Sequence, residues 1–143
     1  MVFVPLRKPI EMINANELRI GNNIAIPECG IQAKVKMLDT KRFAIDIEGI
    51  DLSPGENVFE YQSAEPIPLT PEVLEKCGFE LEEYIGSRKI LWLKNNFRVE
   101  FLANKQVAVF YTYEKCLITY LDNLHRLQNL YFALTGTELE YKP

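Results

Sequence analysis

Residues 119–136 read TYLDNLHRLQNLYFALTG, and the spacing of their apolar side chains decides the fold. Leucine or tyrosine stands at positions 121, 124, 127, 130, 131 and 134, which is the repeat of an amphipathic helix. Thr119 lies three residues before Asp122, a variant of the capping box, and Gly136 provides a stop signal. The pattern predicts one helix over residues 120–135.

The apolar arc of this helix covers about half of its circumference, so the helix must pack on another apolar surface. We expect that surface to be a three-stranded antiparallel meander over residues 89–93, 97–102 and 107–112, which alternate or are rich in β-prone residues. Polar residues gather on the opposite side of the helix, which is therefore expected to face water: Asp122, His125, Arg126 and Asn129.

The first half of the chain has the pattern of short strands with one apolar side. Residues 31–38 alternate apolar and polar side chains, and residues 43–47 and 58–62 continue the pattern. An earlier stretch, residues 18–26, is interrupted by Gly21-Asn22-Asn23, which is typical of a turn or bulge. Four or five short strands so close together predict a small curled antiparallel sheet, of which an SH3-like barrel is one form.

A connector with Pro66 and Pro68 separates the two strand-rich parts, because each proline removes a backbone donor. Thr70 then caps a predicted short helix, residues 71–77, which ends before Gly78. The predicted fold class is α+β. The predicted organisation is an extended N-terminal arm, a β-rich lobe and an α+β lobe that is either separate from the β-rich lobe or compact with it: residues 1–13, 14–65 and 66–143.

The composition is that of an ordinary folded protein. Of 143 residues, 48% are hydrophobic, and the net charge is −4 with a pI near 5.1. This charge argues against a basic nucleic-acid-binding module, since neutralised phosphates supply most of the affinity of such modules. Three widely spaced cysteines and a single histidine predict no metal site, and no cofactor-binding motif occurs. Without an apolar stretch of about 20 residues or a signal peptide, the expected setting is the cytoplasm, with no membrane partner.

Four basic residues share one predicted hairpin and form the charged cluster with the best claim to a function: Lys34, Lys36, Lys41 and Arg42. They could meet the phosphates of a nucleic acid. The alternative is that lysines simply occupy the solvent face of a strand, where they also prevent edge-to-edge aggregation.

Gln128 is the second candidate, because its position on the helical wheel falls inside the apolar arc. A buried amide needs hydrogen-bond partners. We expect those partners to be strand backbone or a neighbouring side chain, and a contact with a ligand or partner protein is the alternative.

Two further groups are weaker candidates. Glu80, Glu82 and Glu83 follow the short helix, and such a run in a loop is usually a solvated surface. Cys116 and His125 could form a nucleophile and base only if the fold brings them together. The cysteines are otherwise expected to be reduced and mostly packed in the core.

Three segments together resemble a family of small uncharacterised proteins of bacteriophages and prophages from gut bacteria. They are residues 16–22 (NELRIGN), residues 65–70 (EPIPLT) with the Leu74 and Cys77-Gly78-Phe79 that follow, and residues 125–139 (HRLQNLYFALTGTEL). The resemblance implies a phage or prophage origin and a bacterial cytoplasmic setting, and it implies no activity. The chain departs from the family in its N-terminal arm and at Asn23, where relatives often carry tryptophan.

These observations rank three functional hypotheses. The first is a non-enzymatic binding or adaptor module whose partner is another protein or a second copy. The second is a nucleic-acid-binding accessory protein that uses the basic hairpin. The third, and weakest, is an enzyme that uses Cys116 and His125.

Overall fold

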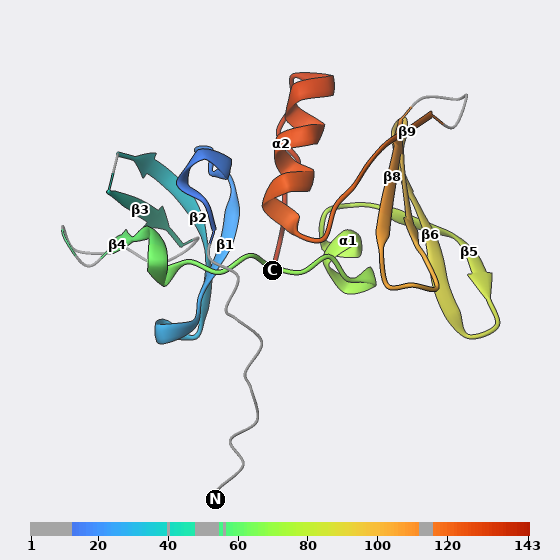
Figure 1. The fold of residues 1–143 in the computed structure, drawn as a ribbon, viewed down its shortest axis with the longest axis horizontal. Coiled ribbons are helices and arrows are strands. Elements are labelled where there is room, and N and C mark those ends of the chain that lie inside the picture. The colour runs from blue at the N-terminus through green and yellow to red at the C-terminus, as the bar shows by residue number, and fades with distance from the viewer. Residues whose placement is uncertain (1–12, 40, 48–54, 56, 112–115) are drawn as a thin grey trace, which may run out of the picture.

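The computed structural model describes residues 13–39, 41–47, 55, 57–111 and 116–143, without the side chains of Ala15 and Cys116. It has two antiparallel sheets and two α-helices, which confirms the α+β class (Figure 1). Most of the predicted N-terminal arm lies outside the described residues. Ile13, at its end, is buried in the first lobe.

The first lobe is a four-stranded sheet in the order of the chain: β1 (Asn23–Ile26), β2 (Ile31–Leu38), β3 (Arg42–Asp46) and β4 (Val58–Glu60). Gly21 supplies the turn before β1 with φ near 99°, a backbone conformation that favours glycine. Short 3-10 turns stand before, between and after the strands: η1 (Ala15–Glu17), η2 (Pro27–Cys29) and η3 (Tyr61–Ser63). The apolar side of the sheet encloses a core of Ile24, Ile26, Val35, Phe43 and Ile45.

The two edges of this sheet are brought together by the chain itself. After β4, the turn η3 leads to Glu65, which exchanges both backbone hydrogen bonds with Ala25 of β1, at 2.8 and 2.9 Å. The sheet is therefore curled, as the sequence predicts, and its β1 edge is partly covered.

The second lobe contains a larger meander than the sequence predicts. Its five strands also follow chain order: β5 (Glu80–Ile85), β6 (Arg88–Lys94), β7 (Phe97–Phe101), β8 (Val107–Tyr111) and β9 (Cys116–Tyr120). The middle three strands are the predicted ones. β5 contains the glutamate run that was expected in a loop, and β9 occupies the stretch where the helix cap was expected.

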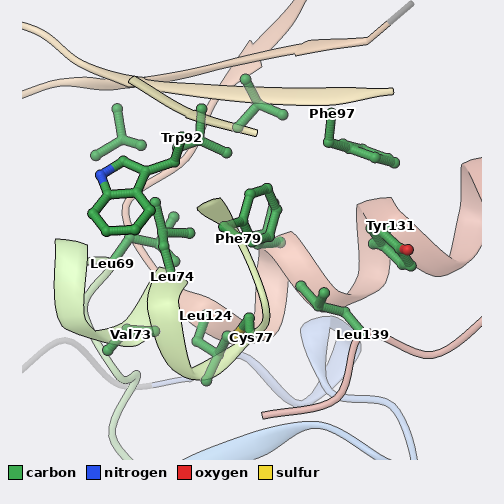
Figure 2. Close-up of a cluster of buried hydrophobic side chains, with 14 of the residues drawn as sticks. Leu69, Val73, Leu74, Cys77, Phe79, Trp92, Phe97, Leu124, Tyr131 and Leu139 are labelled. Atoms are coloured by element: carbon green, nitrogen blue, oxygen red, sulfur yellow. The ribbon is translucent and has the colours of Figure 1, made fainter. Parts of the chain in front are cut away.

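The short helix α1 (Pro71–Lys76) begins as predicted. The hydroxyl of its cap residue, Thr70, accepts a hydrogen bond from the backbone of Val73 at 3.2 Å. Its inner side chains, Val73 and Leu74, pack beneath the sheet with Trp92 and Phe79 (Figure 2). α1 therefore covers part of the inner face of the five-stranded sheet.

The long helix α2 (Leu124–Thr135) begins four residues later than predicted. Asn123, and not Thr119, is its cap, and its side chain accepts from the backbone of Arg126 at 3.1 Å. Thr119 stays in β9 opposite Val109, so the helix starts only where the chain leaves the sheet. The predicted stop at Gly136 is confirmed.

The two sides of α2 pack against different lobes. Leu124, Leu127 and Tyr131 enter the core of the second lobe, and the Tyr131 ring lies 4.9 Å from the ring of Phe97 (Figure 2). α2 stands between the two lobes, so its opposite side faces the first lobe (Figure 1). The expectation of a solvated polar side is confirmed for Asp122 and Arg126, which are exposed, and it is wrong for His125, which is buried because the first lobe is a second packing surface.

Candidate functional site

The contact between the lobes is a polar network around one side of α2. Glu17, at the end of η1, accepts a hydrogen bond from the Arg126 guanidinium at 2.8 Å and lies 3.2 Å from Nε2 of His125. Arg19 forms a two-pronged ion pair with Glu138, one arm of which measures 3.0 Å. The Arg19 guanidinium also lies 4.3 Å from the ring centre of Phe132. The network joins residues more than 100 positions apart in the sequence.

Gln128 occupies the buried centre of this network. Its oxygen accepts from the backbone N–H of Asn23 at 2.8 Å, and its nitrogen donates to the Asn23 side chain at 2.9 Å and to the Leu139 carbonyl at 3.1 Å. The predicted bonding to strand backbone and a neighbouring side chain is therefore present. All of these partners are internal, and Gln128 is fully buried.

His125 is buried as well, with 1% of its surface exposed, so its expected surface position is wrong. Burial lowers the pKa of the imidazole below 6.5, although the Glu17 carboxylate favours the charged form. Nδ1 has no hydrogen-bond partner among the described residues. The Arg126 contact in turn holds the pKa of Glu17 below its ordinary value. The sequence pattern missed this burial because a helical wheel assigns polar residues to the exposed side. It cannot show that a second lobe packs against that side.

Three of the four basic residues lie around neighbouring pockets, because Arg42 lines one with Lys36 and another with Lys41, and Lys34 lies apart from them. Lys36 and Arg42 line an open groove of about 680 Å³, whereas Lys34 lies 3.4 Å from Glu140 in a different pocket beside the C-terminal segment. A β-bulge between Val35 and Met37 breaks the alternation of the strand at Lys36. Acidic residues lie among these cations: Asp39 beside Lys41, Asp46 opposite Lys34, and Glu60 opposite Arg42.

The described thiols differ in environment. Cys77 is buried, and the loss of hydration raises its pKa to about 12, so it is a packing residue with little nucleophilic character. Cys29 is exposed, so of the two described thiols one is packed in the core and the other is not. The Cys116 side chain lies outside the description, so its pairing with His125 stays a hypothesis. The described contact of His125 is with Glu17.

The two edge strands of the second sheet are surfaces that no sequence motif marks. No described strand pairs with the outer edge of β5 or of β9. Along β5, Tyr84 and Ile85 are exposed, and three glutamates accompany them. Along β9, Leu117, Ile118 and Tyr120 are 38–50% exposed, and the strand carries no charge.

The open part of β9 has a defined end. Beyond it, the carbonyl of Asp122 accepts from the backbone N–H of Leu69 at 3.0 Å, and Leu124 donates to Ile67 at 2.8 Å. The connector therefore covers the outer edge from residue 122 onward. Among the described residues, nothing pairs with the outer edge of β9 itself, which we call the β9 edge.

Comparisons with known proteins give no match: no family model, no curated protein and no solved structure is similar to the chain. No helix in the described residues is long and apolar enough to cross a membrane. Within the same residues, no three His, Cys, Asp or Glu side chains gather where they could hold a metal ion.

Proposed function

We propose that the chain is a non-enzymatic adaptor that binds an extended protein segment along the β9 edge. One observation carries this proposal. β9 is an uncharged edge strand with three exposed apolar side chains, at the end of a sheet whose opposite edge carries three glutamates. Natural sheets usually protect their edges with charge, because unpaired backbone groups there recruit other strands. Adding a strand to such an edge is a common mode of protein recognition.

The body behind this edge supports an adaptor role. α2 contributes apolar side chains to the core of the second lobe and polar contacts to the first lobe. The two lobes are therefore joined through α2, and the β9 edge belongs to this joined body. Two side chains that often act in catalysis have structural positions here. His125 lies in the network between the lobes, and Cys77 lies in the core of the second lobe. A preformed edge lowers the cost of ordering on binding.

The same proposal includes membership of the phage and prophage family, with a bacterial cytoplasmic setting. Its support is that the first and third resembling segments meet in space. Glu17 and Arg19 belong to the first segment, and their partners Arg126, Asn129 and Glu138 belong to the third. The residues that carry the resemblance therefore build one structural feature.

The nucleic-acid hypothesis receives less support. Lys34 lies in a different pocket from the other three basic residues, and acidic side chains lie among all four. A phosphate backbone would meet both signs of charge there, which weakens the electrostatic contribution to binding.

Affinity capture from phage-infected bacterial cells tests the adaptor function. The bait is the full chain, compared with Leu117→Lys on the β9 edge and Ile85→Lys on the opposite edge. Both replaced side chains are exposed, at 47% and 63%, so each variant should fold. We expect a protein captured by the wild type and by Ile85→Lys to be lost with Leu117→Lys. Capture that is equal for all three baits, or substrate turnover in a hydrolase and nuclease screen, would contradict the proposal.

A further inference from the structure

We propose that His125 is a pH-sensitive switch in the contact between the two lobes. Protonation of its ring favours a form in which the lobes part while each lobe keeps its own fold. We call the described arrangement the closed form and the separated arrangement the parted form. The switch does not depend on the proposed function, because it concerns the polar side of α2 and not the β9 edge.

The two lobes can part without opening either core, because the buried apolar side chains form two clusters that share no residue. Where the connector passes between the lobes, Glu65 pairs with β1 of the first lobe, and the Ile67 carbonyl accepts from Leu124 of α2 at 2.8 Å. Pro66 alone lies between these two attachments. Parting the lobes therefore breaks polar contacts and the packing of Ala25, a partly buried residue of β1 that lies on the second core.

The surroundings of His125 favour the neutral ring in the closed form. The ring is buried in the first turn of α2, and its Nε2 lies 3.2 Å from a carboxylate oxygen of Glu17. This contact assigns the hydrogen of the neutral ring to Nε2, which donates it. A second proton would have to bind Nδ1, which has no hydrogen-bond partner among the described residues. A buried N–H without an acceptor is costly, so the closed form resists protonation.

Charged groups act on the ring from both sides of the contact. Among the described residues they are Glu17 on η1, Asp122 before the cap of α2, and Arg126 on α2 itself. The two carboxylates favour the protonated ring, but Glu17 already accepts from the Arg126 guanidinium at 2.8 Å. Arg126 and the positive end of the α2 dipole oppose protonation. Burial has the largest effect, and the pKa of His125 lies below 6.5.

Parting the lobes removes this burial. Water then reaches Nδ1 and accepts its hydrogen, so the pKa of the ring returns toward its ordinary 6.5. The parted form therefore binds the proton more tightly than the closed form, and acid favours it. Above about pH 6.5 neither form is protonated and the switch has no effect. Below that pH, the ratio of parted to closed molecules rises by up to about tenfold per pH unit, until the closed form is protonated too.

Hydrogen exchange of the full chain between about pH 7 and about pH 5 tests the switch. The Asn23 N–H donates to Oε1 of Gln128 across the contact at 2.8 Å, so its protection reports on the closed form. The amides of Val35 and Leu121 bond within the first and the second lobe and report on the fold of each. After correction for the intrinsic effect of pH on exchange, we expect acid to lower the protection of Asn23 alone.

Two variants separate protonation from a general weakening of the contact. His125→Gln keeps a side-chain nitrogen that can donate to Glu17 and takes up no proton, so the effect of pH on Asn23 should disappear. Arg19→Ala is the matched control, because it removes the ion pair with Glu138 elsewhere in the same contact. It should lower the protection of Asn23 by the same factor at both ends of the pH range.

Protection of Asn23 that does not change with pH overturns the switch, and so does a pH effect that His125→Gln retains. Parallel loss of protection at Val35 and Leu121 overturns it too, since acid would then unfold the whole chain. The ring signals of the wild type give a second measurement by nuclear magnetic resonance, and they are unambiguous because the chain has one histidine. We expect a pKa below 6.5. A value at or above it would mean that the closed form holds the proton as well as the parted form, which contradicts the switch.

Discussion

At the scale of single residues, the most informative position is Gln128, a fully buried amide whose three hydrogen bonds link α2 to β1 and to the C-terminal segment. Removing one partner of a buried hydrogen bond leaves the other without compensation, which costs about 1–3 kcal/mol for each group. Gln128 alone therefore makes a large contribution to the stability of the contact between the lobes.

We predict that Gln128→Leu lowers the free energy of unfolding by about 3 kcal/mol, because the Asn23 N–H and the Leu139 carbonyl lose their partner. Urea denaturation followed by circular dichroism measures the change. Leu134→Gln, on an exposed position of the same helix, is the matched control and should stay within about 0.5 kcal/mol of the wild type. A loss for Gln128→Leu no larger than that of the control would show that the network contributes little.

His125 makes stability depend on pH. Its pKa in the folded protein lies below 6.5, so the unfolded chain takes up the proton first as the pH falls. The stabilisation from neutral His125 is complete above pH 6.5 and decreases below it, by up to about 1.4 kcal/mol per pH unit. Glu17, Arg126 and Asp122 are the charged groups around the ring. Glu17 should lose its own contribution only at still lower pH, because its pKa is below 4.5.

The measurement is the free energy of unfolding between about pH 7 and about pH 5. We expect the wild type to lose stability over this interval and His125→Gln to lose much less. A wild type that gains stability on acidification would mean that the attraction of Glu17 outweighs burial and that the pKa of His125 is raised instead of lowered.

At the scale of elements, the start of α2 depends on competition between two hydrogen-bonding patterns. Thr119 and Tyr120 pair with β8, and the helix begins only after Asn123 has supplied a cap. The capping-box pattern around Thr119 does not start a helix, because the backbone there pairs with the neighbouring strand β8 instead.

We predict that Asn123→Ala destabilises the protein by about 1 kcal/mol through loss of the cap on the Arg126 backbone. Asn123→Ser keeps a capping oxygen and should retain most of the stability. Thermal unfolding of the two variants side by side makes the comparison. Equal losses for alanine and serine would place the effect in packing rather than in capping.

The central elements could be predicted because their apolar side chains recur at regular spacing or because a clear start signal precedes them. β2 shows strict alternation in the sequence, and Thr70-Pro71 is a strong helix start. The edge strands could not be predicted in the same way. β5 buries few side chains and carries charge, and β9 resembles the beginning of a helix. An edge strand takes its conformation from pairing with a neighbouring strand, and the local sequence does not show which strand that neighbour is.

At the scale of the whole molecule, two apolar cores lie on either side of α2. One contains buried residues between Ile13 and Ala64, and the other contains residues between Ile67 and Tyr141. Sequence patterns could indicate two lobes, but they could not show that polar residues of the last helix join them. The β9 edge could not be predicted for a similar reason, because a strand is known to lie at an edge only once the order of all strands in the sheet is known.

We predict that the two lobes unfold together, because the interlobe network couples them. Trp92, the single tryptophan, lies in the second core and reports on that lobe by fluorescence, whereas far-UV circular dichroism reports on both lobes. The two signals should change at the same denaturant concentration in the wild type. In Arg19→Ala/Gln128→Leu they should separate. Coincident signals in this variant would mean that other contacts couple the lobes.

The segment after α2 has a consequence for biosynthesis. Leu139 and Tyr141 are buried in the second core, the Tyr141 hydroxyl donates to Gln32 of the first lobe, and the Lys142 N–H bonds to the Lys76 carbonyl. A nascent chain on the ribosome therefore lacks pieces of its interior until these residues have emerged. Earlier strands can pair during translation, but the two lobes reach their final packing only after residues 139–142 have emerged from the ribosome.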